Sequence, residues 1–114
     1  MNKKQIKELD KLWSKAVRQV GHCEKCGGTY RLQAAHILSR RHHAVRWLLL
    51  NGICLCYRCH MFWAHKDPLD FVRWLEDVRG VKTLENLRLL SRPEIFGGCR
   101  AKELDYEEVK RTLV

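Results

Sequence analysis

Paired cysteines are the clearest chemical signal in this chain of 114 residues. Two pairs have the spacing Cys-x-x-Cys, with 29 residues intervening between them: Cys23 with Cys26, and Cys56 with Cys59. Each pair offers half of a tetrahedral zinc site, and thiols that stay reduced inside a cell bind metal before they bind each other. Cys54 competes with Cys56 for the second pair, but the matching spacing favours Cys56. We expect Cys54 and Cys99 to be small buried residues.

Five of the six histidines follow the first cysteine pair, between residues 35 and 65. His36, Asn51 and His60 lie 15 and 9 residues apart. An imidazole with a pKa of about 6.5 can take a proton from water at neutral pH, and it can also bind a divalent ion. These residues are therefore candidates for hydrolytic chemistry. The alternative for His36 and His60 is a structural histidine in the core.

The net positive charge lies in the first half of the chain. Residues 1–66 carry a net charge of +10, whereas residues 67–114 carry −1. A strongly basic surface attracts a polyanion, so nucleic acid is the expected partner. Three arginines beside the loop histidines suit phosphate contacts because their planar donor fork can reach two oxygens: Arg40, Arg41 and Arg46. The alternative is a basic surface that only faces water.

A catalytic ion would need more ligands than His60. His65 lies five residues further on, whereas residues four apart share a helical face, so it can join His60 only if the helix ends or loosens near Ala64. His42 and His43 lie on a polar loop and are the other candidates. Their alternative role is a nucleic-acid contact or plain solvent exposure.

The hydrophobic pattern predicts the elements that must position these side chains. Apolar residues at three- and four-residue steps predict a helix over residues 3–20. A strand is expected over 29–37, Asn51-Gly52 favours a hairpin turn before a second strand, and a helix follows from about 57 to 64. The caps that predict three later helices are Asp67, Thr83 and Asp105.

The expected architecture is α+β in a single domain, because 114 residues suffice for one core. Its parts are an N-terminal helix (1–22), a zinc-stapled core (23–66) and a helical C-terminal extension (67–114). No stretch reaches the roughly 18 apolar residues that a membrane span needs, and the basic N-terminus lacks the apolar core of a secretion signal. We therefore expect an intracellular, cytoplasmic protein.

The chain resembles HNH endonucleases of the ββα-metal superfamily, especially the small zinc-containing phage type that includes NinG-type recombination proteins. The motifs that carry the resemblance lie between residues 9 and 70: LDKLWSKAVRQ, the two cysteine pairs, AAHI, SRRHHAVRW, NGICLC and the histidine that follows the second pair. The resemblance implies a core in which a hairpin and one helix hold a divalent ion against a DNA phosphate. If the chain is phage-encoded, its location is the cytoplasm of the host cell.

The same resemblance assigns roles to individual residues. It implies that His36 is the general base, that Asn51 holds His36 in orientation, and that His60 binds a catalytic Mg²⁺ or Mn²⁺, with His65 as a further ligand. The four cysteines are expected to hold a structural zinc. Many family members place an Asp or His ligand directly before the base, and this chain has Ala35 there.

Two functions of different classes follow. The first is a metal-dependent DNA endonuclease that nicks or cleaves double-stranded or branched DNA. One chain makes one nick, so double-strand cleavage requires a homodimer or two encounters. The second is a non-catalytic, zinc-containing DNA-binding accessory protein in recombination or packaging, which Ala35 favours. RNA binding is a weaker third interpretation, because the chain has no aromatic stacking motif of the RRM kind.

Overall fold

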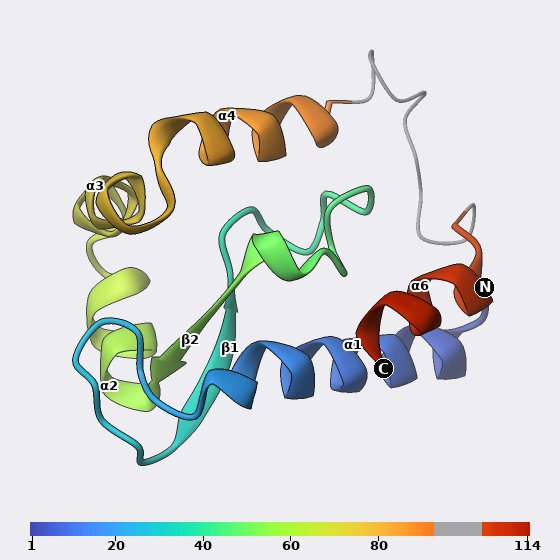
Figure 1. Ribbon diagram of the computed structural model, residues 1–114, viewed down its shortest axis with the longest axis horizontal. Coiled ribbons are helices and arrows are strands. Elements are labelled where there is room, and N and C mark those ends of the chain that lie inside the picture. Colours follow the sequence, from blue (N-terminus) through green and yellow to red (C-terminus); the bar gives the residue numbers. More distant parts are fainter. Residues whose placement is uncertain (93–103) are drawn as a thin grey trace.

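The computed structural model describes residues 1–92 and 104–114 and has an α+β architecture, as the sequence predicts. A two-stranded antiparallel sheet lies among the helices (Figure 1). The described elements are α1 (Lys3–Val17), β1 (Leu32–His36), β2 (Gly52–Cys56), α2 (Tyr57–Cys59), α3 (Pro68–Arg79), α4 (Val81–Leu90) and α6 (Tyr106–Leu113). Cys99, for which we predict a buried position, lies outside the described residues.

Helix α1 supports one face of the hairpin. It begins with a capping box, in which the Asn2 side chain accepts from the Gln5 backbone N–H and the Gln5 side chain accepts from the Asn2 backbone N–H. A 3₁₀ turn, Arg18–Val20, extends the helix as far as Gly21, whose positive φ ends it. The predicted helix over 3–20 is therefore confirmed.

The strands pair in a register that places His36 opposite Gly52. Gly52 leaves room for α1: a Cβ atom added there would lie 2.8 Å from Trp13 Cζ2 and would also meet the Val17 side chain. Only glycine therefore lets α1 approach this end of the hairpin so closely. The same approach brings Trp13 onto His36.

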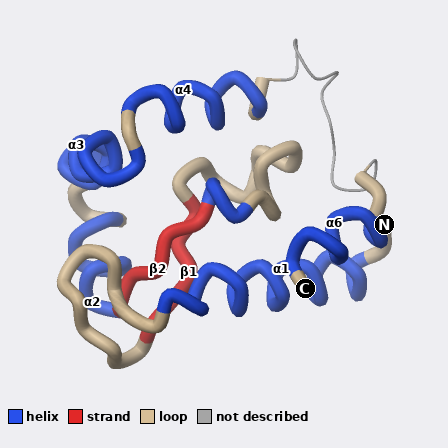
Figure 2. Tube along the Cα trace, in the orientation of Figure 1, coloured by secondary structure: helices blue, strands red, loops and turns tan. Residues whose placement is uncertain are grey.

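A loop of residues 37–51 joins the two strands (Figure 2). Asn51 lies in a 3₁₀ turn, Leu49–Asn51, and Gly52 is extended, with φ −120°. The predicted Asn-Gly hairpin turn is therefore wrong. A two-residue turn of that kind needs positive φ, whereas here the Asn51 side chain is buried and hydrogen-bonded to the backbone of Leu38.

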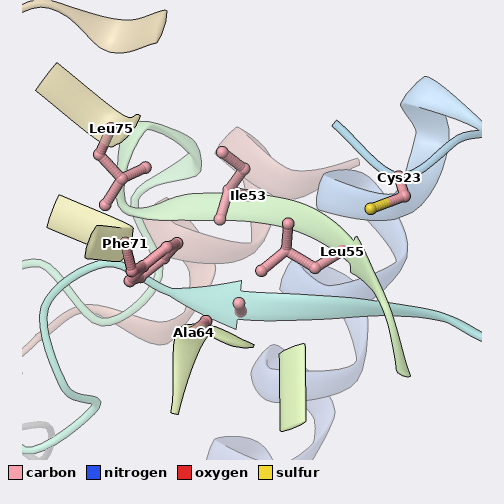
Figure 3. Close-up of a cluster of buried hydrophobic side chains, with 7 residues drawn as sticks. Cys23, Ile53, Leu55, Ala64, Phe71 and Leu75 are labelled. Carbon is pink, nitrogen blue, oxygen red and sulfur yellow. The ribbon is translucent and has the colours of Figure 1, made fainter. Parts of the chain in front are cut away.

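Two groups of buried side chains hold the helices on opposite faces of the hairpin. The first joins α3 to the face of the hairpin opposite α1 (Figure 3). It consists of Cys23, Ala35, Ile53, Leu55, Ala64, Phe71 and Leu75. The second joins α1 to the loop and to α6, and consists of Leu9, Trp13, Trp47 and Leu113. The hairpin is thus covered on both faces, and its ends carry the side chains of interest.

The C-terminal helices differ in part from the sequence prediction. Asp67 and Asp105 cap α3 and α6 through their side chains, as expected. Thr83 does not cap a helix, because α4 begins directly after Gly80, whose positive φ turns the chain between α3 and α4. Within the described ranges, no helix is long and apolar enough to cross a membrane.

Candidate zinc cluster and histidine site

Four cysteine side chains meet where the turn before β1 touches the end of β2. The Sγ atoms of Cys23, Cys26, Cys56 and Cys59 all lie within 4.8 Å of one another, and those of Cys26 and Cys56 are 3.7 Å apart. A tetrahedral zinc with Zn–S bonds of about 2.3 Å requires S–S separations of about 3.8 Å. The group therefore has the size and the ligand set for a metal ion such as zinc, and it is the set that the sequence predicts.

Backbone N–H groups donate to these sulfurs. Gly28 N donates to Cys26 Sγ at 3.4 Å, and Cys59 N donates to Cys56 Sγ at 3.5 Å. Burial raises the pKa of the Cys23 thiol, but backbone N–H donors outweigh it and lower that pKa to about 7. Burial, followed by hydrogen bonds from the other three sulfurs, raises the pKa of Cys59. Four thiols this close cannot all ionise without a cation among them, which is the chemistry of a metal site.

The neighbouring Cys54 is fully buried and belongs to another environment. Its backbone N–H donates to Glu24 Oε2 at 2.7 Å, and burial raises the pKa of its thiol. This agrees with the prediction that Cys54 is a small buried residue. Glu24 also forms an ion pair with Arg79 at 3.4 Å. Through these two contacts, Glu24 connects the first cysteine turn to β2 and to α3.

His36 lies at the end of β1 between α1 and the long loop. Its ring stacks on Trp13 with centroids 3.9 Å apart and planes 10° apart. Its Nε2 lies 3.1 Å from the backbone oxygen of Arg46. A carbonyl only accepts, so Nε2 carries the proton and Nδ1 has the free lone pair. Burial lowers the pKa of His36, which favours the neutral ring at pH 7.

Asp10 of α1 fixes the loop segment that contacts His36. Its carboxylate accepts from Arg46 Nε at 3.1 Å and Nη2 at 2.8 Å, and from Trp47 Nε1 at 2.9 Å. The Arg46 side chain is only 13% exposed. Arg46 is thus bound within the protein through both its side chain and its carbonyl. Arg40 and Arg41, in contrast, are exposed on the loop.

Asn51 fixes the chain directly after His36. Its amide oxygen accepts from Leu38 N at 2.7 Å, its amide nitrogen donates to Leu38 O at 3.0 Å, and its backbone oxygen accepts from Ile37 N at 2.9 Å. Asn51 is fully buried. It therefore acts on His36 through the backbone of the two following residues, and the ring itself contacts Arg46 and Trp13.

His60 and His65 form a pair because the helix changes its hydrogen-bonding pattern between them. The segment His60–Ala64 is a π-helical turn, in which His65 N donates to His60 O at 3.2 Å across five residues. The two rings lie 4.5 Å apart at 74°. Burial, followed by the charges of His65 and His36, lowers the pKa of His60. The helix therefore loosens near Ala64, which is the condition for His65 to lie beside His60.

Gln33 is a site residue that sequence reasoning missed. Its Oε1 lies 2.8 Å from His60 Nδ1, so this nitrogen donates and Nε2 has the free lone pair. Gln33 is two residues before Ala35 in β1, and side chains alternate along a strand, so both lie on the same face. Ala35 itself is 2% exposed and packs in the core. The period of two was the only signal that could have linked Gln33 to this face.

The loop histidines have other surroundings. The backbone N–H of His42 donates to Ser39 O at 2.9 Å in a turn. His43 lines an apolar cavity of about 240 Å³ with Trp47 of the loop and Val109 of α6.

The cysteine cluster and the histidine site meet in one segment, since Cys59 is followed directly by His60. A metal held by the cysteines would therefore fix the start of the helix that carries the histidine pair. Comparisons of the chain with protein-family models, with curated proteins and with solved structures gave no match.

Proposed function

We propose that the chain is a metal-dependent DNA endonuclease of the HNH type, in which His36 is the general base of phosphodiester hydrolysis. One observation carries the proposal: His36 has one ring nitrogen bound to a fixed carbonyl and the other free to accept a proton. A general base needs this arrangement, together with a pKa near or below the working pH. The basic half of the chain, with a net charge of +10, supports DNA as the substrate.

The surroundings of His36 suit each stage of proton transfer. Burial keeps the ring neutral, so Nδ1 can take the proton of the attacking water. When Nδ1 is protonated, the Nε2–H still donates to the Arg46 carbonyl, and the flat face of Trp13 lies against the charged ring. Asp10 holds the side chain of Arg46, whose carbonyl accepts from His36, and Asn51 holds the backbone directly after His36.

His60 and His65 are the residues that would hold the catalytic ion. Two imidazoles suit Mn²⁺ better than Mg²⁺, which prefers oxygen ligands. The bound ion would neutralise charge on the phosphoryl and leaving oxygens. Gln33 accepts the Nδ1 proton of His60, which fixes its tautomer and leaves Nε2 as the ligand atom. The structural zinc of the four cysteines would hold this helix in place.

We assign DNA contacts to the exposed loop arginines, Arg40 and Arg41, which follow His36 in sequence. Arg46 is the third arginine of the sequence prediction. Its side chain is bound to Asp10, and its carbonyl accepts from His36, so its main role is to position His36. Contacts of guanidinium groups with phosphates carry little sequence information, so we expect weak sequence specificity.

A second function is favoured by Ala35. This residue occupies the position before the base and is packed in the core with Ala64, so no ligand reaches the ion from there. A zinc-containing accessory protein that binds DNA without cutting it is the function that this feature supports. Cleavage separates the two functions directly.

The test is relaxation of supercoiled plasmid by the zinc-loaded protein with Mn²⁺, Mg²⁺ or EDTA. We expect ion-dependent nicking that His36→Ala reduces by roughly a hundredfold or more, the usual effect of losing a general base. His22→Ala is the matched control, because His22 is exposed and lies before the first cysteine pair. DNA binding without nicking under any ion would instead support the accessory function.

A further inference from the structure

A surface beside the cysteine cluster carries both aromatic rings and positive charges. Its residues come from the turn before β1 and from the segment that begins with α2. We call it the aromatic face, and it consists of Tyr30, Arg31, Tyr57, Arg58, Phe62 and Lys66. Tyr30 is 80% exposed and Phe62 is 55% exposed. Rings that gather on a surface with a charged rim are typical of interaction sites.

The rings of the aromatic face are contiguous. Tyr30 and Tyr57 line one groove of about 380 Å³, together with Gly28 of the first cysteine turn. Phe62 meets Tyr57 edge-on, with centroids 5.7 Å apart. The groove holds the rings of Tyr30 and Tyr57, and the contact between Tyr57 and Phe62 extends the row of rings beyond it. A chain of flat groups can follow this path.

Cations accompany each part of this path. Arg31 lies 4.2 Å from the ring centre of Tyr57, and Lys66 lies 5.1 Å from that of Phe62. Arg31 has a φ of 54°, and its carbonyl accepts from Tyr57 N at 2.9 Å, so its position is fixed by the backbone. Arg58 lines the same groove. The ion pairs found between described side chains use none of these three cations, which leaves their charge for a partner.

We propose that the aromatic face binds single-stranded DNA. Unpaired bases stack on the exposed rings of Tyr30 and Phe62, while Arg31, Arg58 and Lys66 contact the flanking phosphates. A duplex hides the faces of its bases, so it can use the cations of this surface but not its rings. The residues differ from those of the histidine site, and the face binds a strand whether or not the histidines cut one.

The test measures equilibrium binding by fluorescence anisotropy. Zinc-loaded protein is titrated into a labelled oligo(dT) strand or a labelled duplex of equal length, without added Mn²⁺ or Mg²⁺. We expect wild type to bind oligo(dT) at least as tightly as the duplex. Tyr30→Ala and Phe62→Ala should each weaken oligo(dT) binding by about tenfold, the loss typical of one stacked base, and change duplex binding less than about twofold.

Three variants serve as controls. Tyr30→Phe keeps the ring and should keep oligo(dT) affinity. Leu69→Ala removes a side chain that is 79% exposed outside this face and should change nothing. His36→Ala should bind oligo(dT) normally, which separates this surface from a failure of the proposed nuclease. Equal losses for both DNAs, no loss when either ring is removed, or the same loss with Tyr30→Phe would each overturn the proposal.

Discussion

Asn51→Ala should destabilise the protein strongly, and the structure gives the size of the effect. Asn51 is fully buried, and its amide makes two hydrogen bonds to the backbone of Leu38, at 2.7 and 3.0 Å. Alanine would leave the N–H and C=O of Leu38 without these partners. A buried polar group left unpaired costs about 1–3 kcal/mol, so the two together should cost about 2–6 kcal/mol. The total stability of a domain of this size is about 5–15 kcal/mol.

The assay is urea unfolding of zinc-loaded protein, followed by circular dichroism. Asn86→Ala is the matched control, because Asn86 is exposed in α4 and alanine is a good helix former. It should leave the midpoint unchanged or raise it slightly. A loss below about 1 kcal/mol for Asn51→Ala would refute the structural role of Asn51. If stability stayed high while nicking disappeared, the side chain would be acting on His36 directly.

Three further predictions concern other contacts. Gly52→Ala should lower the melting temperature by several degrees in thermal unfolding, because its Cβ would press on Trp13. Bound zinc, measured per chain, should fall from one to none in Cys56→Ala but not in Cys54→Ala; equal loss in both would contradict the four-cysteine site. Burial lowers the pKa of His36 and of His60, so the unfolded chain binds more protons than the folded one near their pKa. The free energy of unfolding, measured by urea titration at constant zinc occupancy, should therefore rise from about pH 5 to 7. A free energy of unfolding that falls over this range would contradict the prediction.

The features that the sequence predicted well are encoded locally. The spacing Cys-x-x-Cys forms a turn with both thiols on one side, so two such pairs predict a four-thiol site without knowledge of the fold. The apolar steps between Leu9 and Trp13 likewise predict the face of α1. The side-chain caps at Asp67 and Asp105 also depend on neighbours in sequence, and both are confirmed.

The features that the sequence pattern did not predict depend on residues far apart in the chain. The acceptor for His36 is a backbone carbonyl ten residues away, and its stacking partner, Trp13, lies in another helix. A single Gln33 in a strand carries no pattern that points to His60. The Asn51-Gly52 pair favours a turn in the sequence but places a buried amide in the structure, because both use the same residue types and only the fold decides between them.

Chemical rescue of His36→Gly tests the role of His36 most directly. Glycine leaves a gap the size of an imidazole between the Trp13 ring and the Arg46 carbonyl, the two groups that hold the native ring. We expect the zinc-loaded variant to lack nicking activity and to regain it as free imidazole is added, with Mn²⁺ present throughout. Wild-type activity without imidazole, or a folded, zinc-loaded variant that imidazole never restores, would contradict His36 as the general base.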